Sequence, residues 1–275
     1  MCLAAVDGGA APGLVLLVSV RRQTVFHEAF GSRQLVPRRL PALRDTVYDV
    51  ASLTKAVATS VLAMQEVGAG RLALDEPAAT LVPELAAGGD ERRAQITVRH
   101  LLAHASGLPA HRPFWRQAAH SPAERLAIAR LAAREPLEHP PGTRAVYSDL
   151  GFILLGWLLE RLTGTRLDVL FAERIAGPLG LRATAFVSLA DADARARLLG
   201  DRTVAATQLS VERHGPALGE VDDMNAFAMG GIAGHAGLFG TADELAAIAG
   251  ALVRAWGGEG GGLVAPEVIR QFWAP

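Results

Sequence analysis

Apolar residues form extended runs near the N-terminus and helix-period stripes along the rest of the chain. The run at 14–20, a turn and a second extended segment at 24–31 together predict a β-hairpin with one well-buried strand. The turn lacks the glycine or asparagine that short hairpin turns favour. Because an isolated hairpin is unstable, we expect more sheet or a helix layer to cover it.

Helical periodicity dominates the rest of the chain. One predicted helix begins at Ser52, and its apolar stripe runs through Leu53, Val57, Val61 and Met64. Further helices are predicted at 96–102, at 121–134, from 150 to 162 with Gly164 as C-cap, from 245 to 256 after a Thr241/Glu244 capping box, and near Pro266. Residues 188–222 have weak periodicity and predict a long, partly irregular excursion. Strands are therefore expected only near the N-terminus.

Composition narrows the class of protein. With 275 residues and 50% of them hydrophobic, the chain can bury a large core, and a net charge of −1 argues against a nucleic-acid partner. No apolar run is long enough to span a bilayer, so we expect no transmembrane segment. The single Cys2 excludes an intrachain disulfide, and its position beside Met1 does not match a signal peptide. As written, the chain is predicted to be cytoplasmic; the alternative is a mis-set start that lost an export signal.

Lysine usage points to one position. Lys55 is the only lysine among the 27 basic residues. Arginine keeps its proton under ordinary conditions, whereas a lysine amine can release it. A chain that needs a nitrogen base at one position cannot use arginine there, so Lys55 is a candidate catalytic residue.

Ser52 and Lys55 are spaced to cooperate. Residues three apart at the start of a helix lie on the same face, and the partial positive charge of the helix N-terminus favours a neutral amine and a nearby oxyanion. A neutral amine beside a serine can take its proton and make it a nucleophile. The plainer alternative is that Ser52 caps the helix and Lys55 is solvated.

Tyr147 is a second candidate. It is one of only two tyrosines, with Tyr48, and it lies between a Pro-Pro-Gly turn and a strongly apolar helix. A phenol held close to Lys55 can relay a proton to a leaving group. The alternative is a core tyrosine anchored by one hydrogen bond.

Four segments together resemble one known family. The segment 47–55 resembles the nucleophile segment of class C β-lactamases and penicillin-binding-protein-like serine hydrolases. The segments 100–109, 141–152 and 230–239 resemble the H-L-L-x-H-x-S-G-L-P stretch, the P-G-x-x-x-x-Y-S-N/D element and a glycine-rich segment of esterase-like members. The resemblance runs from about Pro12 to the end of the chain.

The resemblance implies roles for individual residues. Ser52 would be acylated by an ester, a β-lactam or a D-Ala-D-Ala-type peptide, with Lys55 as the base and Tyr147 as the proton relay. Asp149 stands where Asn is more usual and would touch Lys55 or the substrate amide; its charge favours a protonated lysine. The expected partner is a small-molecule or peptidoglycan-like acyl substrate. No metal or organic cofactor is implied, and family members are often periplasmic or secreted.

The family also carries a Lys/His-Thr/Ser-Gly triplet on a late strand that lines the pocket. His235-Ala236-Gly237 resembles it superficially, but a capped helix is predicted to follow directly. We interpret His235 as a pocket-rim or structural residue, and we keep His235 and Gly237, with Asp149, as substrate-binding candidates. On this interpretation the C-terminal strands that complete the family's sheet, and one oxyanion-hole donor, are missing.

The expected fold class is α+β, of the β-lactamase/transpeptidase type, with an antiparallel sheet flanked by helices and a helical subdomain. We expect one domain over 1–275: a hairpin and connection at 12–50, a mainly helical part at 51–240 with the motifs, and a helix at 241–275 that returns to the sheet.

Three functions remain open from the sequence. The first is an active serine hydrolase. The second is a catalytically weak or inactive homologue that binds acyl-peptide ligands or needs a partner chain. The third is an unrelated helical binding protein with chance motifs.

Overall fold

The computed structural model describes residues 1–87, 89–117, 125–200, 202–210 and 215–273. The strands are β1 (Gly13–Val20), β2 (Gln23–Gln34), β3 (Leu40–Pro41), β4 (Tyr48–Asp49), β5 (Ala185–Phe186), β6 (Ala206–Ser210), β7 (Gly215–Leu218) and β8 (Leu238–Gly240). The α-helices are α1 (Cys2–Asp7), α2 (Ser60–Gly68), α3 (Val98–Leu102), α4 (Arg125–Arg134), α5 (Asp149–Thr163), α6 (Leu167–Phe171), α7 (Gly177–Leu179), α8 (Ala192–Gly200), α9 (Met224–Ala228), α10 (Ala242–Trp256) and α11 (Pro266–Trp273). Two π-helical segments, η1 (Lys55–Thr59) and η7 (Ala172–Ala176), and four short 3₁₀ segments, η2 (Ala78–Thr80), η3 (Pro83–Leu85), η4 (Glu91–Gln95) and η5 (Phe114–Arg116), complete them.

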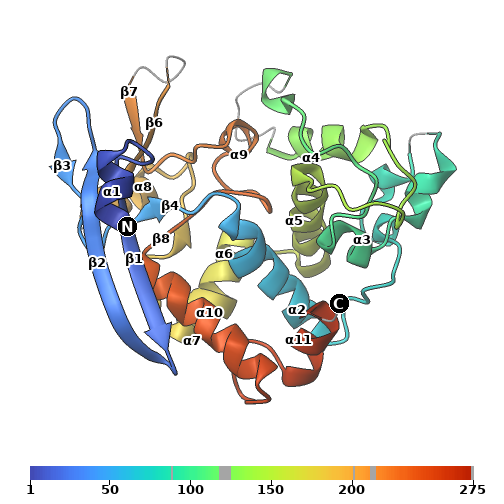
Figure 1. Cartoon of the computed structure of the whole chain (residues 1–275). Coiled ribbons are helices and arrows are strands. Elements are labelled where there is room, and N and C mark those ends of the chain that lie inside the picture. The colour runs from blue at the N-terminus through green and yellow to red at the C-terminus, as the bar shows by residue number, and fades with distance from the viewer. Residues whose placement is uncertain (88, 118–124, 201, 211–214, 274–275) are drawn as a thin grey trace.

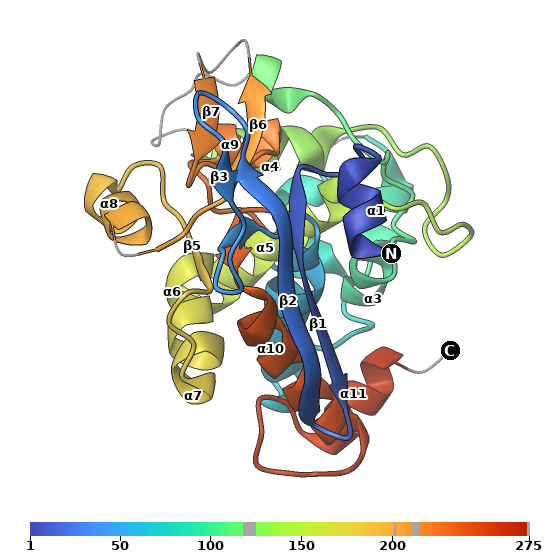
Figure 2. The same ribbon diagram turned by 60° about the vertical axis from the view of Figure 1, so that its left-hand side comes forward.

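The N-terminal hairpin forms one side of the molecule (Figure 1). β1 pairs antiparallel with β2, which pairs with β3. Arg21 and Arg22 make the two-residue turn with φ angles of 50° and 71°, the left-handed region that such turns require and that glycine or asparagine usually supplies. α10 packs against β1, so the predicted helix layer behind the hairpin is present (Figure 2).

The prediction of a well-buried strand is wrong. No residue of β1 is buried, and Leu16, Val18 and Val20 are exposed at 37%, 38% and 52%. Within the described residues β1 has one strand neighbour, β2, and two helices contact it, α10 and α1. The edge of β1 away from β2 therefore has no strand partner, and an apolar run alone does not reveal this.

Strands also occur outside the N-terminal region, which corrects the prediction that they lie only there. A small antiparallel sheet has the order β4-β8-β5, and β6 pairs with β7. Strands of two or three residues are too short to show a period-2 pattern in the sequence. The pair β6–β7 interrupts the irregular region predicted over 188–222, of which residues 201 and 211–214 lie outside the described residues.

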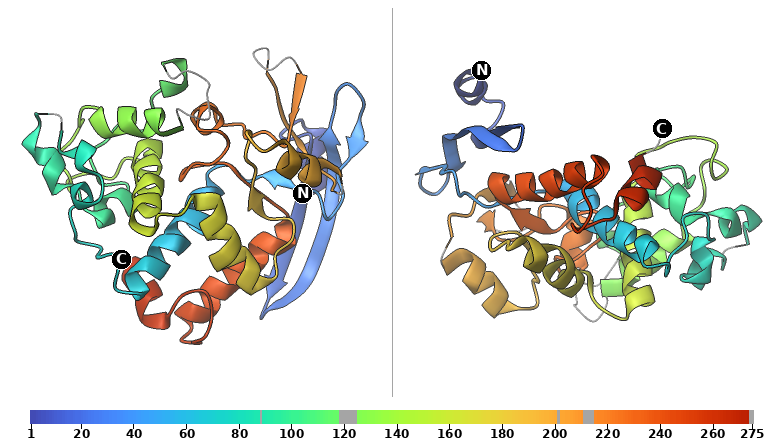
Figure 3. Two further views of the ribbon diagram at one scale, coloured as in Figure 1. Left: turned by 180° about the vertical axis from the view of Figure 1, so that it is seen from behind. Right: turned by 90° about the horizontal axis from the view of Figure 1, so that it is seen from below.

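The helical part surrounds the segment that carries Ser52 and Lys55. α5 packs against α3 and α4, while η1 contacts both α5 and α10, which places η1 near the centre of the molecule (Figures 1 and 3). The predicted helices near 96–102, 150–162, 245–256 and 266 are all present, and Gly164 ends α5 with a φ of 67°. The helix predicted over 121–134 is seen as α4, and its first four positions lie outside the described residues.

One predicted cap is wrong. Thr241 is the N-cap of α10 but makes no side-chain capping bond. The Glu244 carboxylate instead accepts hydrogen bonds from the backbone N–H groups of Arg182 and Ala183, at 2.7 and 3.0 Å. The N–H groups of Arg182 and Ala183, which would otherwise lack acceptors, therefore take the place of the Thr241 N–H as the partners of Glu244. Across the described ranges, no helix has the length and apolar character needed to cross a bilayer.

Candidate active site

A sharp turn presents Ser52 between the small sheet and the central helix. Ala51, directly before it, has a φ of 47°, an uncommon conformation for a residue with a side chain. The Asp49 carboxylate holds the turn by accepting hydrogen bonds from the N–H groups of Ala51, at 2.9 Å, and Asp222, at 2.7 Å. Burial raises the pKa of Asp49 above its ordinary value, although these two N–H donors oppose the shift. The turn thus links β4 directly to the helix that carries Lys55.

The helix after Ser52 is wound more widely than predicted. Lys55 to Thr59 form a π-helical segment before the α-helix continues as α2, and such turns are frequent at functional sites. Val61 and Met64 are buried as expected, but Leu53 is 54% exposed, so the predicted stripe is wrong at its first position. Leu53 precedes the π turn, and the wider winding changes the phase of the later positions.

Lys55 is buried and makes three polar contacts. Its Nζ lies 2.9 Å from Ser52 Oγ, 2.7 Å from Asp149 Oδ1 and 3.2 Å from the carbonyl oxygen of His235. Only 5% of the side chain is exposed. A lysine amine nitrogen can take part in three hydrogen bonds, and each of these three positions has a partner here. The solvated-lysine alternative is therefore excluded by the structure.

The first residue of α5 provides the carboxylate. Ser148 caps this helix by accepting a hydrogen bond from the N–H of Gly151, at 3.3 Å, and the N–H of Asp149 donates to the carbonyl of Ala110, at 2.8 Å. These bonds fix the start of α5 against the loop that follows α3. Asp149 Oδ1 then contacts Lys55, while Oδ2 lies 3.5 Å from Nδ1 of His111.

Tyr147 lies beside Lys55 but is not a core residue. It is 56% exposed, and its ring centroid is 4.9 Å from Lys55 Nζ and 4.5 Å from the ring centroid of His104. Among the described residues its hydroxyl has no hydrogen-bond partner. The N–H of Ser148 donates to His104 Nδ1 at 3.0 Å, and burial, followed by the charge of Lys55, lowers the pKa of His104. A neutral imidazole therefore supports the phenol ring from one side.

The glycine-rich segment 231–237 packs against the opposite side of η1. Thr59 Oγ1 donates to the carbonyl of Gly234 at 2.7 Å, and the N–H of Leu238 donates to Thr54 Oγ1 at 3.2 Å. Gly237 has a φ of +114°, and a Cβ there would lie 2.2 Å from the carbonyl oxygen of Gly231. Only glycine fits at this position. These contacts bring the His235 carbonyl to Lys55.

The His235 side chain lies in the interior. It is 1% exposed, and its Nε2 is 2.8 Å from Asp223 Oδ1. Asp223 also caps α9 by accepting a bond from the N–H of Ala226 at 2.7 Å. Burial alone would raise the pKa of Asp223, but the charge and hydrogen bond of His235, the Ala226 N–H and the charge of His111 together lower it. The predicted contacts of His235 and Gly237 with a substrate stay predictions.

The sequence alone pointed to Ser52, Lys55, Tyr147 and Asp149, and the structure brings these four together. The sequence patterns assigned no role to His104, His111 or Asp223. His104 was visible within the 100–109 motif, and Asp223 has the pattern of a helix N-cap. No local pattern singles out His111.

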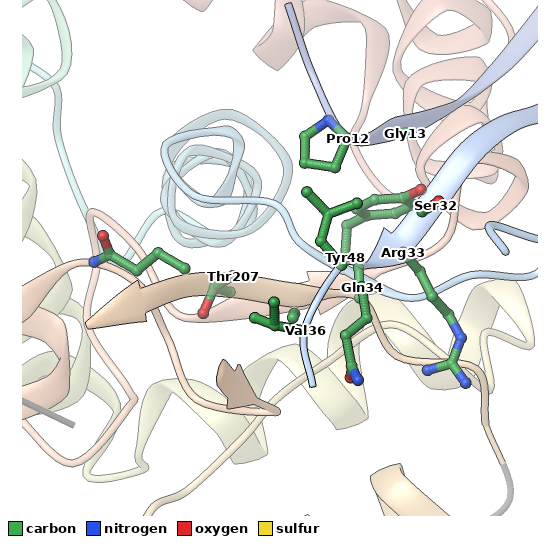
Figure 4. A pocket seen from close by; sticks show the side chains of 12 residues that line it. Pro12, Gly13, Ser32, Arg33, Gln34, Val36, Tyr48 and Thr207 are labelled. Carbon is green, nitrogen blue, oxygen red and sulfur yellow. The ribbon is translucent and has the colours of Figure 1, made fainter. Parts of the chain in front are cut away.

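A separate pocket of about 290 Å³ is lined by the start of β1, the end of β2, β4 and the start of β6 (Figure 4). Tyr48 lines it, but the Tyr48 hydroxyl is itself buried without a partner among the described residues, and burial raises the pKa of this phenol. Ser52, Lys55 and Tyr147 do not line this pocket. The cluster around Lys55 is therefore a distinct site.

Comparison with known proteins gives a consistent assignment. A protein of Escherichia coli O157:H7 named "Putative D-alanyl-D-alanine carboxypeptidase" is 31% identical over 291 residues, covering 97% of this chain and 65% of that protein. The N-acetylmuramyl-L-alanine amidase of Bacillus subtilis (strain 168) is 32% identical over 257 residues, covering 86% of this chain and 57% of that protein. This chain therefore spans about two thirds or less of the length of these relatives.

Comparison with solved structures shows a similar fold. The octameric penicillin-binding protein homologue from Pyrococcus abyssi superposes with a TM-score of 0.74 at 24% identity, covering 96% of this chain and 56% of that one. This similarity supports the predicted β-lactamase/transpeptidase-like α+β fold. The sequence model of the Beta-lactamase family matches residues 3–275. With that match over nearly its whole length, the chain belongs to the Beta-lactamase family.

Proposed function

We propose that this chain is a serine hydrolase that forms an acyl-enzyme on Ser52. Lys55 is the base that takes the Ser52 proton, and Tyr147 passes a proton to the leaving group. The substrate is an ester, a β-lactam or a D-Ala-type amide. The observation that supports this most directly is the contact of 2.9 Å between Lys55 Nζ and Ser52 Oγ, because proton transfer needs this hydrogen-bond distance.

Protons and bonds balance in the proposed acylation step. Lys55, as a neutral amine, accepts the Ser52 hydroxyl proton while Oγ attacks the carbonyl carbon. The tetrahedral oxyanion then collapses, and the bond to the leaving group breaks as that group receives the proton of the Lys55 ammonium through the Tyr147 hydroxyl, which leaves Lys55 neutral again. Water hydrolyses the acyl-enzyme and restores the Ser52 hydroxyl. The hydrogen bonds from Lys55 to Asp149 and to the His235 carbonyl keep the amine directed at Ser52.

The Ser52 N–H is the proposed first donor to the oxyanion. Among the described residues it donates to no backbone or side-chain acceptor, whereas the N–H groups of Leu53, Thr54 and Lys55 are each bonded within the turn. A free N–H at the start of a helix stabilises negative charge. This geometry favours acyl transfer over a purely binding role.

The substrate class is proposed from the relatives. Their names refer to a D-alanyl-D-alanine carboxypeptidase and an N-acetylmuramyl-L-alanine amidase, and both names describe an amide bond that involves alanine. We therefore place a peptidoglycan-like acyl peptide first, with small esters as surrogate substrates that share the chemistry.

A fluorophosphonate probe tests the proposal. Incubation followed by peptide mapping should place the adduct on Ser52, and Ser52→Ala should abolish it. Lys55→Arg keeps the charge but removes the base, so it should slow labelling by about a hundredfold or more. A folded protein that carries no adduct on Ser52 would exclude the acyl-enzyme mechanism.

A second candidate is a weak or inactive homologue that binds acyl-peptide ligands or works only with a partner chain. It is favoured by the open edge of β1 and by the exposed side chains of Leu16, Val18 and Val20. Light scattering after gel filtration, combined with p-nitrophenyl ester turnover, distinguishes the two. A stable monomer with rapid turnover would rule out this candidate.

A further inference from the structure

His111 interacts with two carboxylates, those of Asp149 and Asp223. Its Nδ1 is 3.5 Å from Asp149 Oδ2, and its charge also acts on Asp223. The His111 side chain is 48% exposed, whereas that of Lys55 is 5% exposed. His111 is thus the solvent-side member of this group of charges.

The backbone holds His111 in this place from both sides. On one side, the carbonyl of Ala110 accepts a hydrogen bond from the N–H of Asp149 at 2.8 Å. On the other, the carbonyl of Arg112 accepts one from Asn225 Nδ2 at 2.8 Å. The two neighbours of His111 are therefore tied to α5 and α9, the helices that carry Asp149 and follow Asp223.

The Asp149 carboxylate is shared. Oδ1 contacts the buried amine of Lys55 at 2.7 Å, and Oδ2 faces the imidazole of His111. We propose that His111 sets the charge of Lys55 through this shared carboxylate, so that the Ser52–Lys55 pair keeps a neutral amine at lower pH than it would without the imidazole. The catalytic meaning of this inference rests on the proposed function; the coupling of the three charges does not.

The direction of the effect follows from electrostatics. Histidine is the side chain whose charge changes between pH 5 and 8. When His111 is protonated, it offsets the negative charge of Asp149, and the carboxylate stabilises the Lys55 ammonium less. Because His111 is half exposed, we expect a moderate effect. At pH values where His111 is protonated, the neutral fraction of Lys55 should be about fivefold larger in the wild type than in a variant without that imidazole.

The other charged groups nearby are already engaged. Arg112 pairs with Glu135, at 2.6 Å, and with Glu138, at 3.0 Å. Asp223 pairs with His235 at 2.8 Å. Among the described residues, the other titratable groups beside Lys55 are Tyr147, whose ring centroid is 4.9 Å from its amine, and His104, whose ring packs on that of Tyr147. His111 is half exposed and contacts the shared carboxylate, so it is a positioning residue that acts through Asp149.

The single lysine allows a direct test. Biosynthetic labelling with lysine carrying ¹³C at Cε places the label in Lys55 alone, and its NMR shift reports the charge of the amine in the whole chain. In the wild type we expect the Lys55 signal to show a step in the histidine range before its main titration. His111→Asn and His111→Gln should remove that step. Asp149→Asn should remove it too, because the shared carboxylate is gone.

His139→Asn is the matched control, because His139 lies 3.5 Å from Arg144 and contacts neither Lys55 nor Asp149. It should leave the step unchanged. In the wild type, the midpoint of the step must also coincide with that of the His111 ring signal, a comparison that needs no variant. A Lys55 titration that is single-stepped in the wild type, or identical in folded His111→Asn, would overturn the inference.

Kinetics give the second readout. The ratio of kcat/KM for wild type over His111→Asn on a p-nitrophenyl ester should be near one above about pH 8 and rise to about fivefold near pH 6. A merely structural role would change the ratio equally at all pH values. If the NMR step is present but Ser52 takes no probe, the charge inference holds and the proposed function fails. The two are therefore tested separately.

Discussion

Replacing Asp149 with Asn is the most informative change to the proposed mechanism. In the wild type, Lys55 Nζ lies 2.7 Å from Asp149 Oδ1. The amide of the variant keeps an oxygen that can accept this hydrogen bond, but it removes the negative charge. A base must be neutral before it can take the Ser52 proton. Since the carboxylate stabilises the ammonium form, its removal should increase the active fraction of Lys55 at neutral pH.

The magnitude follows from the geometry. Two unit charges about 4 Å apart interact by about 4 kcal/mol at the effective dielectric typical of protein sites. Asp149 is 20% exposed and shares its charge with His111, so part of that attraction is lost to solvent and to the second partner. If about 1.5 kcal/mol remains, the neutral fraction of Lys55 rises about tenfold. We therefore expect kcat/KM at pH 7 to rise about tenfold in Asp149→Asn.

The assay is p-nitrophenyl ester hydrolysis followed across pH. The increase should be largest on the acidic side and disappear at alkaline pH, where Lys55 is neutral in both proteins. Asp75→Asn is the control, because Asp75 pairs with Arg99 at 2.7 Å on the surface, with 73% of its side chain exposed. If Asp149→Asn lowers kcat/KM by the same factor at every pH, Lys55 acts as an ammonium, and its assignment as the base is wrong.

Two further changes test the framework around the site. Burial would raise the pKa of Asp223, but His235 and the other partners lower it. The ionised carboxylate therefore stabilises the fold at pH values above its unfolded-state pKa of about 4, and this contribution is lost as the pH falls further. Asp223→Asn should therefore cost about 2 kcal/mol in urea unfolding at pH 7 and progressively less below pH 4; an equal cost at both would contradict the ion-pair explanation. Gly237→Ala should lower the melting temperature strongly, at a cost of about 3 kcal/mol or more, because its Cβ would lie 2.2 Å from a carbonyl oxygen, whereas Gly262→Ala, with open space around it, should change little. Equal melting temperatures for these two variants would refute the close contact at Gly237.

The sequence determined the parts of this protein that depend on neighbouring residues. The spacing of Ser52 and Lys55 predicts a shared helix face, and their side chains do meet. The hairpin and the helices around 150–162 and 245–256 follow from apolar periodicity, which reports local backbone geometry. The pairing of Asp149 with Lys55, across 94 positions, was anticipated only through the family resemblance.

Only the tertiary structure decided which distant groups meet and which apolar faces are covered. Glu244 binds the backbone near Arg182 instead of capping its own helix, and the apolar residues of β1 remain partly open. The small sheet joins β4, β5 and β8, which are too short to carry a sequence pattern. His111 reaches the site because hydrogen bonds tie its two neighbours to Asp149 and Asn225, and Asp223 reaches it by pairing with His235. Such contacts depend on the summed packing of the whole chain, and no local periodicity encodes them.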